Sequence, residues 1–399
     1  MIMNYHNPIL PGMFPDPSIA RIGNRYYLAN STFQYFPGIA LSTSEDLLNW
    51  RRMPGAVSQV TQADLTQAKA NEGIFAVNIR AHAGALYAIT TNFAEFKTFI
   101  LRGEVDPHGQ IQWDNDRVVV DVPGIDPDLY FEDDRVYVQF TGYVNDHGTK
   151  AIRQVEIDLQ TGECLTQPQV LTYGTGGRDV EGPHIIKHHD WYYLLAAEGG
   201  TASGHMITMF RSRQLWGPYA SCPQNPLFTN RDRASEPLQN IGHGDLFQDP
   251  HGNWWLVCLG TQPTQANFQE YTLTGRETLL YPVNWENDWP QIYTGVPTVD
   301  VDLTQWPKHA AALTNPQWQT SWQADINAAR LDPEWMSLRV APPISLASDR
   351  LTLNGTADEL STPVGHPGFL GVRLTDTNQT LAIDVAPRTK LGHGRVGLV

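Results

Sequence analysis

Five similar segments recur along this chain, and each joins an apolar strand to an aromatic-rich strand through a polar turn such as GN, DD or HGN. Their spacing of roughly 50 to 60 residues is typical of a repeat architecture. Five blades of about four strands each would fill about the first 300 residues. The sequence therefore predicts an all-β fold with a five-bladed β-propeller. The segments read ARIGNRYYLANST, IRAHAGALYAITTN, YFEDDRVYVQFTG, IKHHDWYYLLAAEGG and LFQDPHGNWWLVCLG.

One position in these repeats carries reactive side chains. Eleven residues before an aromatic residue of the second strand, the five copies have Asp16, Ala76, Asp126, Glu181 and His243. If the copies are blades around one axis, this position forms a ring of side chains that faces one centre. Three acids and a histidine in such a ring resemble an active site, but Asp-Pro is also common in ordinary turns. The repeat alone does not separate these two interpretations.

The chain is long enough for two domains. We assign residues 1–302 to the propeller, and the Pro-, Gln- and Asn-containing stretch 303–324 to a linker. Short strand-like runs such as DRLTLNG, GFLGVRLT and TLAIDVA predict a second all-β unit over 325–399. Because so few residues rarely complete a β-sandwich, we expect an incomplete sandwich. Its unpaired strand edge would favour either self-association into a homo-oligomer or disorder after about Asp325.

The overall charge argues against two classes of partner. The formal net charge is −15 and the isoelectric point is near 5.2, with no cluster of Lys or Arg. Nucleic acid and anionic membranes are therefore poor partners. A neutral ligand such as a sugar suits the chain better, because 12 Trp and 15 Tyr provide flat apolar faces, although most of these rings are expected to fill sheet interfaces.

Cysteine usage and the N-terminus bear on the cellular compartment. Cys164, Cys222 and Cys258 are odd in number and lack metal-ligand spacing, so we expect reduced thiols. The start, MIMNYHNPIL, has no basic region followed by an apolar core, and no apolar run approaches the length of a membrane span. These features favour a cytoplasmic protein.

Several further motifs, in order along the chain, make the sequence resemble glycoside hydrolase family 43. The resemblance is strongest to its branch of β-xylosidases and α-L-arabinofuranosidases with a C-terminal β-sandwich. It implies a five-bladed propeller that hydrolyses glycosidic bonds with inversion at the anomeric carbon, without a required cofactor. The motifs are NPILPGMFPDPSIARIGNRYYLANSTFQYFPG, GIDPDLYFEDD, GGRDVEGPHIIKHHDWYYLLAAEGGTASGHM, GPYASCPQNPL, IGHGDLFQDPHGNWWLV and TGRETLLYPVNWENDWP, followed by ARLDPEWMSLR and GFLGVRLT in the tail.

The resemblance assigns roles to the three acids. Asp16 in FPDPS matches the general base, which deprotonates a water molecule, and Glu181 in VEGPH matches the general acid, which protonates the leaving oxygen. Asp126 in GIDPD matches the third carboxylate, which raises the pKa of the acid and orients it. Asp128, two residues later, is expected to point away from this ring.

It also assigns residues that contact substrate. Arg276 in TGRET matches an arginine that binds the terminal sugar near the carboxylates. His243 in GHGDL matches a histidine near the propeller axis that faces the substrate and a cation or water cluster. A role for His243 in binding a metal, such as a structural Ca²⁺ near the axis, is therefore left open, although no oxygen-rich loop in the sequence requires calcium.

The aromatic wall of the sugar pocket is matched by the first and second repeats. Phe33, Tyr35 and Phe36 lie in STFQYFPG, and Phe75 lies in GIFAVNIR. Where the family usually has Ala-Pro after this second aromatic position, the chain has Ala and then Val77. The pocket rim, and with it the substrate preference, could therefore differ from that of the family.

These residues lead to an expected activity. The leading hypothesis is an inverting exo-glycosidase that releases terminal xylose from short xylo-oligosaccharides, a β-1,4-xylosidase. An α-L-arabinofuranosidase acting on arabino-oligosaccharides, or a bifunctional enzyme, is the alternative, since the two sugars can present matching hydroxyls. A non-catalytic sugar-binding propeller is a further alternative, against which the presence of all three acids argues.

Overall fold

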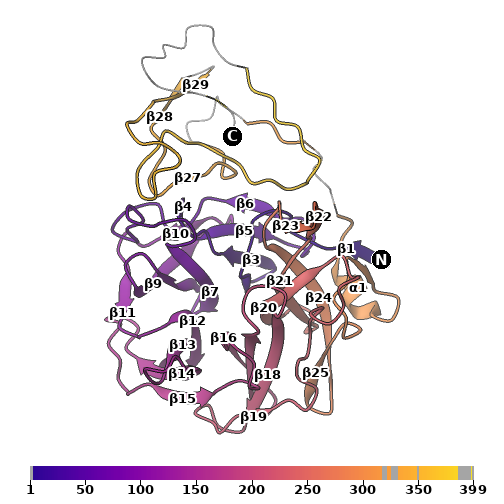
Figure 1. Cartoon of the computed structure of the whole chain (residues 1–399). Coiled ribbons are helices and arrows are strands. Elements are labelled where there is room, and N and C mark those ends of the chain that lie inside the picture. The colour runs from indigo at the N-terminus through magenta and orange to yellow at the C-terminus, as the bar shows by residue number, and fades with distance from the viewer. Residues whose placement is uncertain (1–2, 317–320, 325–330, 348–349, 385–396, 398–399) are drawn as a thin grey trace.

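The structure is a computed structural model that describes residues 3–316, 321–324, 331–347, 350–384 and 397. Five antiparallel sheets follow one another along the chain and form the five blades of a propeller (Figure 1). The aromatic position of each repeat lies in the second strand of its blade, as the repeat predicts. The all-β, five-bladed architecture expected from the sequence is confirmed.

Each blade is a meander of four strands, with the first strand nearest the axis. Blade 1 comprises β2 (Ser18–Ile22), β3 (Arg25–Asn30), β5 (Ala40–Ser44) and β6 (Arg51–Met53). Blade 2 comprises β7 (Ile74–His82), β8 (Ala85–Asn92), β9 (Lys97–Val105) and β10 (Ile111–Trp113), with β11 (Val118–Val120) also pairing with β9. Blade 3 comprises β12 (Ile125–Glu132), β13 (Arg135–Tyr143), β14 (Lys150–Ile157) and β15 (Gln169–Thr172).

Blade 4 comprises β16 (Glu181–His188), β17 (Trp191–Glu198), β18 (Met206–Ser212) and β19 (Ala220–Ser221). Blade 5 comprises β20 (Gln239–Gln248), β21 (Trp254–Thr261), β24 (Glu277–Glu286) and β25 (Trp289–Ile292). A small hairpin of β22 (Thr264–Ala266) and β23 (Gln269–Tyr271) is inserted between β21 and β24.

The N-terminal segment joins the two ends of the ring. β1 (Asn4–His6) pairs with β26 (Asp300–Asp302), which follows the last blade. The Asn7 side chain then accepts a hydrogen bond from Leu280 N at 2.9 Å and donates one to Leu280 O at 3.0 Å. These bonds cover an edge of β24 that β25 leaves free, so the segment that precedes the first blade is held to the last blade.

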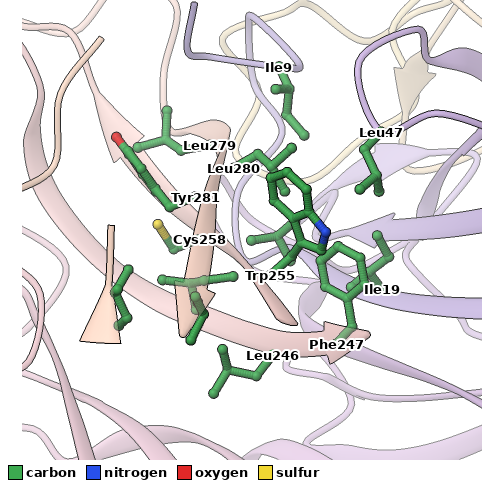
Figure 2. Packing of buried hydrophobic residues seen from close by; sticks show 14 of the residues in the cluster. Ile9, Ile19, Leu47, Leu246, Phe247, Trp255, Cys258, Leu279, Leu280 and Tyr281 are labelled. Carbon is green, nitrogen blue, oxygen red and sulfur yellow. The ribbon is translucent and has the colours of Figure 1, made fainter. Parts of the chain in front are cut away.

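The core consists of apolar layers between neighbouring sheets. Figure 2 shows the layer between blades 1 and 5, where Ile19 and Leu47 lie close to Phe247 and Trp255. Trp255 is fully buried, and its indole N–H donates to the Asp249 carboxylate at 3.1 Å. Burial of such large rings is the main source of stability in a sheet interface.

The meander also determines which loops lie beside the axis. In every blade, the first strand starts, the second strand ends and the third strand starts at the same end of the blade. The connections between second and third strands therefore gather on one face of the propeller, which we call the entry face. These connections are residues 31–39, 93–96, 144–149, 199–205 and 262–276.

Residues after the last blade contact the propeller in several places. The first part of the predicted linker forms α1 (Pro307–Ala312), and Trp306, Ala310 and Leu313 are buried in the propeller core. Further on, β27 (Ser337–Leu338) pairs with β4 (Tyr35–Phe36) of the connection in blade 1. The domain boundaries at 302 and 324 stay predictions, since the chain from 303 to 313 packs onto the propeller.

The C-terminal unit contains β-structure within its described residues. β28 (Ile344–Ala347) and β29 (Arg350–Leu353) pair antiparallel, and β29 covers the RLTL part of the predicted DRLTLNG strand. Of GFLGVRLT, Gly371 makes one isolated bridge to Met336, and the described part of TLAIDVA, up to residue 384, is outside any strand. No described helix is long and apolar enough to cross a membrane.

Candidate active site

The side chains at the repeated register do face one centre, because the inner strands bulge there. In β7, β12 and β20, the pairing with the second strand shifts by one extra residue where Ala76, Asp126 and His243 lie, and in β16 the shift follows directly after Glu181. A β-bulge bends its strand and changes the direction of a side chain. Asp16, just before β2, shares the left-handed backbone of Asp126 and His243, with φ of 50°, 51° and 41°. All three acids and His243 are buried.

Asp16 is held by three neighbours. Ser31 Oγ donates to its Oδ2 at 2.6 Å, Arg276 Nη1 donates to its Oδ1 at 2.9 Å, and His243 Nδ1 lies 3.6 Å from the same Oδ1. Burial acts to raise the pKa of Asp16, but Arg276, His243 and the Ser31 hydrogen bond outweigh it and lower the pKa. Asp16 is therefore an ionised carboxylate, as a general base requires.

Glu181 has the opposite environment. Burial first and the Asp126 charge second raise the pKa of Glu181 to about 8, and Lys150 only partly offsets them. Asp126 contacts the residue that follows Glu181, because Gly182 N donates a hydrogen bond to Asp126 Oδ2 at 3.2 Å. Burial raises the pKa of Asp126 as well, with His243 acting against it. Glu181 therefore carries a proton at neutral pH, and the negative charge of Asp126 helps to keep it protonated.

His243 lies between Asp16 and the backbone of blade 4. Gly182 has a φ of 58°, and a Cβ there would lie 3.0–3.1 Å from the His243 ring, so glycine allows this close approach. Burial lowers the pKa of His243, which favours a neutral imidazole. No group of three or more His, Cys, Asp or Glu within the described ranges could hold a metal ion. Calcium prefers six to eight oxygen ligands, which these residues do not supply, so the calcium role of His243 stays a prediction.

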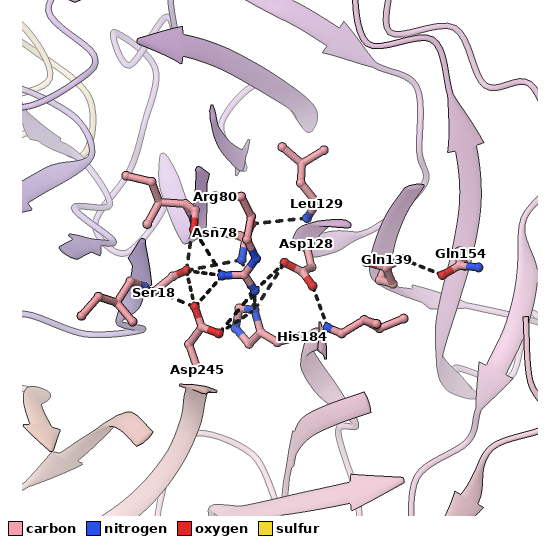
Figure 3. Close-up of polar contacts among 12 residues, drawn as sticks. Ser18, Asn78, Arg80, Asp128, Leu129, Gln139, Gln154, His184 and Asp245 are labelled. Atoms are coloured by element: carbon pink, nitrogen blue, oxygen red, sulfur yellow. Dashed lines mark hydrogen bonds and ion pairs between the residues drawn. The ribbon is translucent and has the colours of Figure 1, made fainter. Parts of the chain in front are cut away.

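A second polar layer lies directly below the ring and was not predicted from the sequence. Arg80 of β7 bonds to Asp245 at 2.7 Å, to Asp128 at 2.9 Å and to His184 Nδ1 at 3.1 Å (Figure 3). Ser18 of blade 1 also donates to Asp245, at 2.7 Å. Asp128 is therefore outside the catalytic ring, as expected, but it faces the same axis one layer deeper, where it neutralises Arg80.

We predict that Arg80→Met destabilises the protein by about 3–5 kcal/mol, because Asp128 and Asp245 would be left buried without a counter-ion. Urea unfolding followed by tryptophan fluorescence measures this loss. Arg102→Met is the matched control, since Arg102 pairs with Glu104 on the surface, where ion pairs contribute little. A loss below about 1 kcal/mol for Arg80→Met would show that the axial layer does not stabilise the ring.

The aromatic residues expected at the pocket divide into two places. Phe33 and Phe75 meet edge to face with ring centroids 6.0 Å apart, and Arg276 Cζ lies 5.4 Å from the Phe33 centroid. Phe36 and Tyr35 instead form β4 and pair with Ser337 and Leu338 of the C-terminal unit. The structure therefore brings Arg276 to Asp16, with Phe33 beside Arg276 and Phe75 beside Phe33, and places Phe36 at the contact with β27.

Arg276 pairs with Asp16 and not with Glu277, its neighbour in the sequence. Arg276 bonds to Asp16, while the neighbouring Glu277 accepts hydrogen bonds from Gly12 N at 2.9 Å and from Gln262 at 2.9 Å. Lys150, which the sequence did not single out, pairs with Asp179 at 2.8 Å and influences Glu181. Both basic side chains thus act in the same sense, since Arg276 lowers the pKa of Asp16 and Lys150 limits the rise in the pKa of Glu181.

Comparisons with known proteins identify the family of this chain. The family model for glycosyl hydrolases family 43 matches residues 5–290. A non-reducing-end α-L-arabinofuranosidase of Bacteroides ovatus is 34% identical over 99% of this chain and 73% of its own length. A xylosidase/arabinosidase of Butyrivibrio fibrisolvens is 34% identical over 92% of this chain and 72% of its own.

Solved structures give the same result. The structure of a xylan β-1,4-xylosidase from Bacillus halodurans is 30% identical, with a TM-score of 0.81 over 93% of this chain and 72% of that chain. The matched family segment includes the five blades, apart from the last two residues of β25, and every residue of the buried carboxylate ring. The chain is therefore a member of glycosyl hydrolase family 43.

Proposed function

We propose that this protein is an inverting exo-glycosidase that releases single pentoses from short oligosaccharides, with β-1,4-xylosidase as its leading activity. The observation that carries the proposal is the pair of buried carboxyl groups with opposite pKa shifts, Asp16 lowered and Glu181 raised. Pairs of titratable groups pushed apart in this way identify the base and the acid of a site. The names of the relatives from Butyrivibrio fibrisolvens and Bacillus halodurans support the pentose.

In the proposed reaction, Glu181 gives its proton to the glycosidic oxygen while the bond to the anomeric carbon breaks. Asp16 takes a proton from a water molecule, whose oxygen attacks that carbon from the opposite face of the sugar. The two carboxyl groups of an inverting enzyme lie about 6.5–9.5 Å apart to leave room for the water. Proton exchange with solvent then restores both groups. Arg276 keeps Asp16 ionised and oriented throughout.

The pH profile should report the acid. Because Glu181 must be protonated, kcat/KM should fall as pH rises through about 8. The negative charge of Asp126 helps to raise the pKa of Glu181, so Asp126→Asn should move this basic limb to lower pH. Initial rates from pH 4 to 10 measure the shift. A basic limb that does not move, with wild-type rates, would remove Asp126 from the mechanism.

An α-L-arabinofuranosidase is the second candidate, favoured by the name of the Bacteroides ovatus relative. Parallel hydrolysis of 4-nitrophenyl β-xyloside and 4-nitrophenyl α-L-arabinofuranoside distinguishes the two activities. We expect the higher kcat/KM on the xyloside. A higher value on the arabinofuranoside would reverse the order of preference, and no hydrolysis of either would contradict the proposed function. The cytoplasmic location stays a prediction, which cell fractionation would test.

A further inference from the structure

Two aromatic residues that the sequence did not single out extend the wall of the pocket. Phe93 stacks on Phe75 with ring centroids 4.4 Å apart and planes at 4°, and Phe96 meets Phe93 edge to face at 5.9 Å. Phe75 in turn contacts Phe33, which lies beneath Arg276. The result is an unbroken series of rings that begins beside the catalytic base and ends at Phe96.

The outer part of this series lies on the entry face. Phe93 and Phe96 belong to the connection between β8 and β9, in residues 93–96. Phe96 is 56% exposed and Phe93 is 37% exposed, whereas Phe33 and Phe75 are only partly accessible. The series therefore runs from the side chains beside Asp16 to solvent on the entry face.

The connection that carries these rings is held firmly. Glu95 forms a two-bond ion pair with Arg117, at 2.5 and 2.7 Å, and accepts a hydrogen bond from Asn92 at 2.7 Å. Backbone bonds from Phe93 N to Gly73 O at 2.7 Å, and from Phe96 N to Phe93 O at 3.2 Å, close the turn. Exposed aromatic rings on a rigid turn lose little conformational entropy when they bind a ligand.

We propose that Phe93 and Phe96 form a binding site for the penultimate sugar of the substrate, whose apolar C–H face packs on the rings. The inference rests on the proposed function. An exo-acting enzyme encloses only the terminal sugar, so the next sugar lies at the mouth of the pocket. The aromatic series is continuous with the terminal pocket, and no charged side chain in the described structure stacks on Phe93 or Phe96. A neutral pyranose suits such a surface.

The test compares a ligand with one sugar and a substrate with two. In Phe96→Ala, and more strongly in the Phe93→Ala/Phe96→Ala double variant, KM for xylobiose should rise, by about tenfold in the double variant, with kcat nearly unchanged. The inhibition constant of free xylose, which reports the terminal pocket alone, should change less than twofold. Leu165→Ala is the matched control, because Leu165 is 55% exposed and lies in the loop between β14 and β15, at the opposite edge of its blade.

Each result has a distinct meaning. Wild-type KM for xylobiose in both variants would overturn the proposed site. An equal rise in KM and in the xylose inhibition constant would also overturn it, because the rings would then belong to the terminal pocket. If the wild-type enzyme hydrolyses neither xylobiose nor the two aryl glycosides, the proposed function itself fails, and the site for a second sugar fails with it.

Discussion

Replacing Asp16 with Asn is expected to lower kcat toward the upper end of the about 10²- to 10⁴-fold range typical of a lost general base. The amide keeps the size of the side chain but cannot take a proton from water. The amide oxygen can still accept from Arg276 Nη1, and the amide nitrogen can donate to Ser31 Oγ, so the fold should persist. Steady-state rates on 4-nitrophenyl β-xyloside, with a thermal unfolding curve for each variant, measure both effects.

The control for Asp16→Asn is a buried aspartate outside the ring. Asp249 lies in the turn between β20 and β21, at the end of the blade opposite the carboxylate ring. It accepts hydrogen bonds from Trp255, Asn253 and His251 N. Asp249→Asn should lower stability without a comparable loss of kcat. If Asp16→Asn kept more than a tenth of the wild-type rate, Asp16 would not be the base.

Glu181→Gln should show a loss that depends on the leaving group. Natural sugar leaving groups need a proton, so kcat on xylobiose should fall by about 10²- to 10⁴-fold. A 2,4-dinitrophenyl glycoside has a leaving group that departs without protonation, and its rate should fall far less. The high-pH decline of kcat/KM, which we assign to Glu181 with a pKa of about 8, should also disappear.

The ratio of the two rates is an internal control, since misfolding would lower both equally. Equal losses on xylobiose and on the activated glycoside would therefore show that Glu181 acts in some way other than proton donation. Retention of the basic limb in Glu181→Gln would assign that limb to another group. Asp126, whose pKa is also raised by burial, would be the first candidate.

Periodic features of the chain were predictable from the sequence. The five repeats and the position of Asp16, Asp126, Glu181 and His243 recur at fixed offsets, and in the structure they form blades and a ring. The bulges that turn these side chains inward were not predictable, because an extra residue in one strand is visible only once its partner strand is known.

Features that depend on contacts between distant blades were missed for the same reason. Arg80 lies in an ordinary strand sequence, and only the fold brings Asp128 and Asp245 to it. The exposed Phe96 could have been noticed, since aromatic residues in a polar turn are unusual, but its place beside Phe93 and the pocket needs the propeller. The place of Phe36 could not be predicted either, because its pairing partner Ser337 lies about 300 residues away in the chain.

The stereochemistry of the first product tests the central claim most directly. Proton NMR during the first minutes of β-xyloside hydrolysis distinguishes α- from β-xylose before the two interconvert. Attack by water activated at Asp16, on the face opposite the oxygen protonated by Glu181, predicts α-xylose as the first product. Initial release of β-xylose would show retention of configuration, and would contradict the assignment of Asp16 as a base that acts through water.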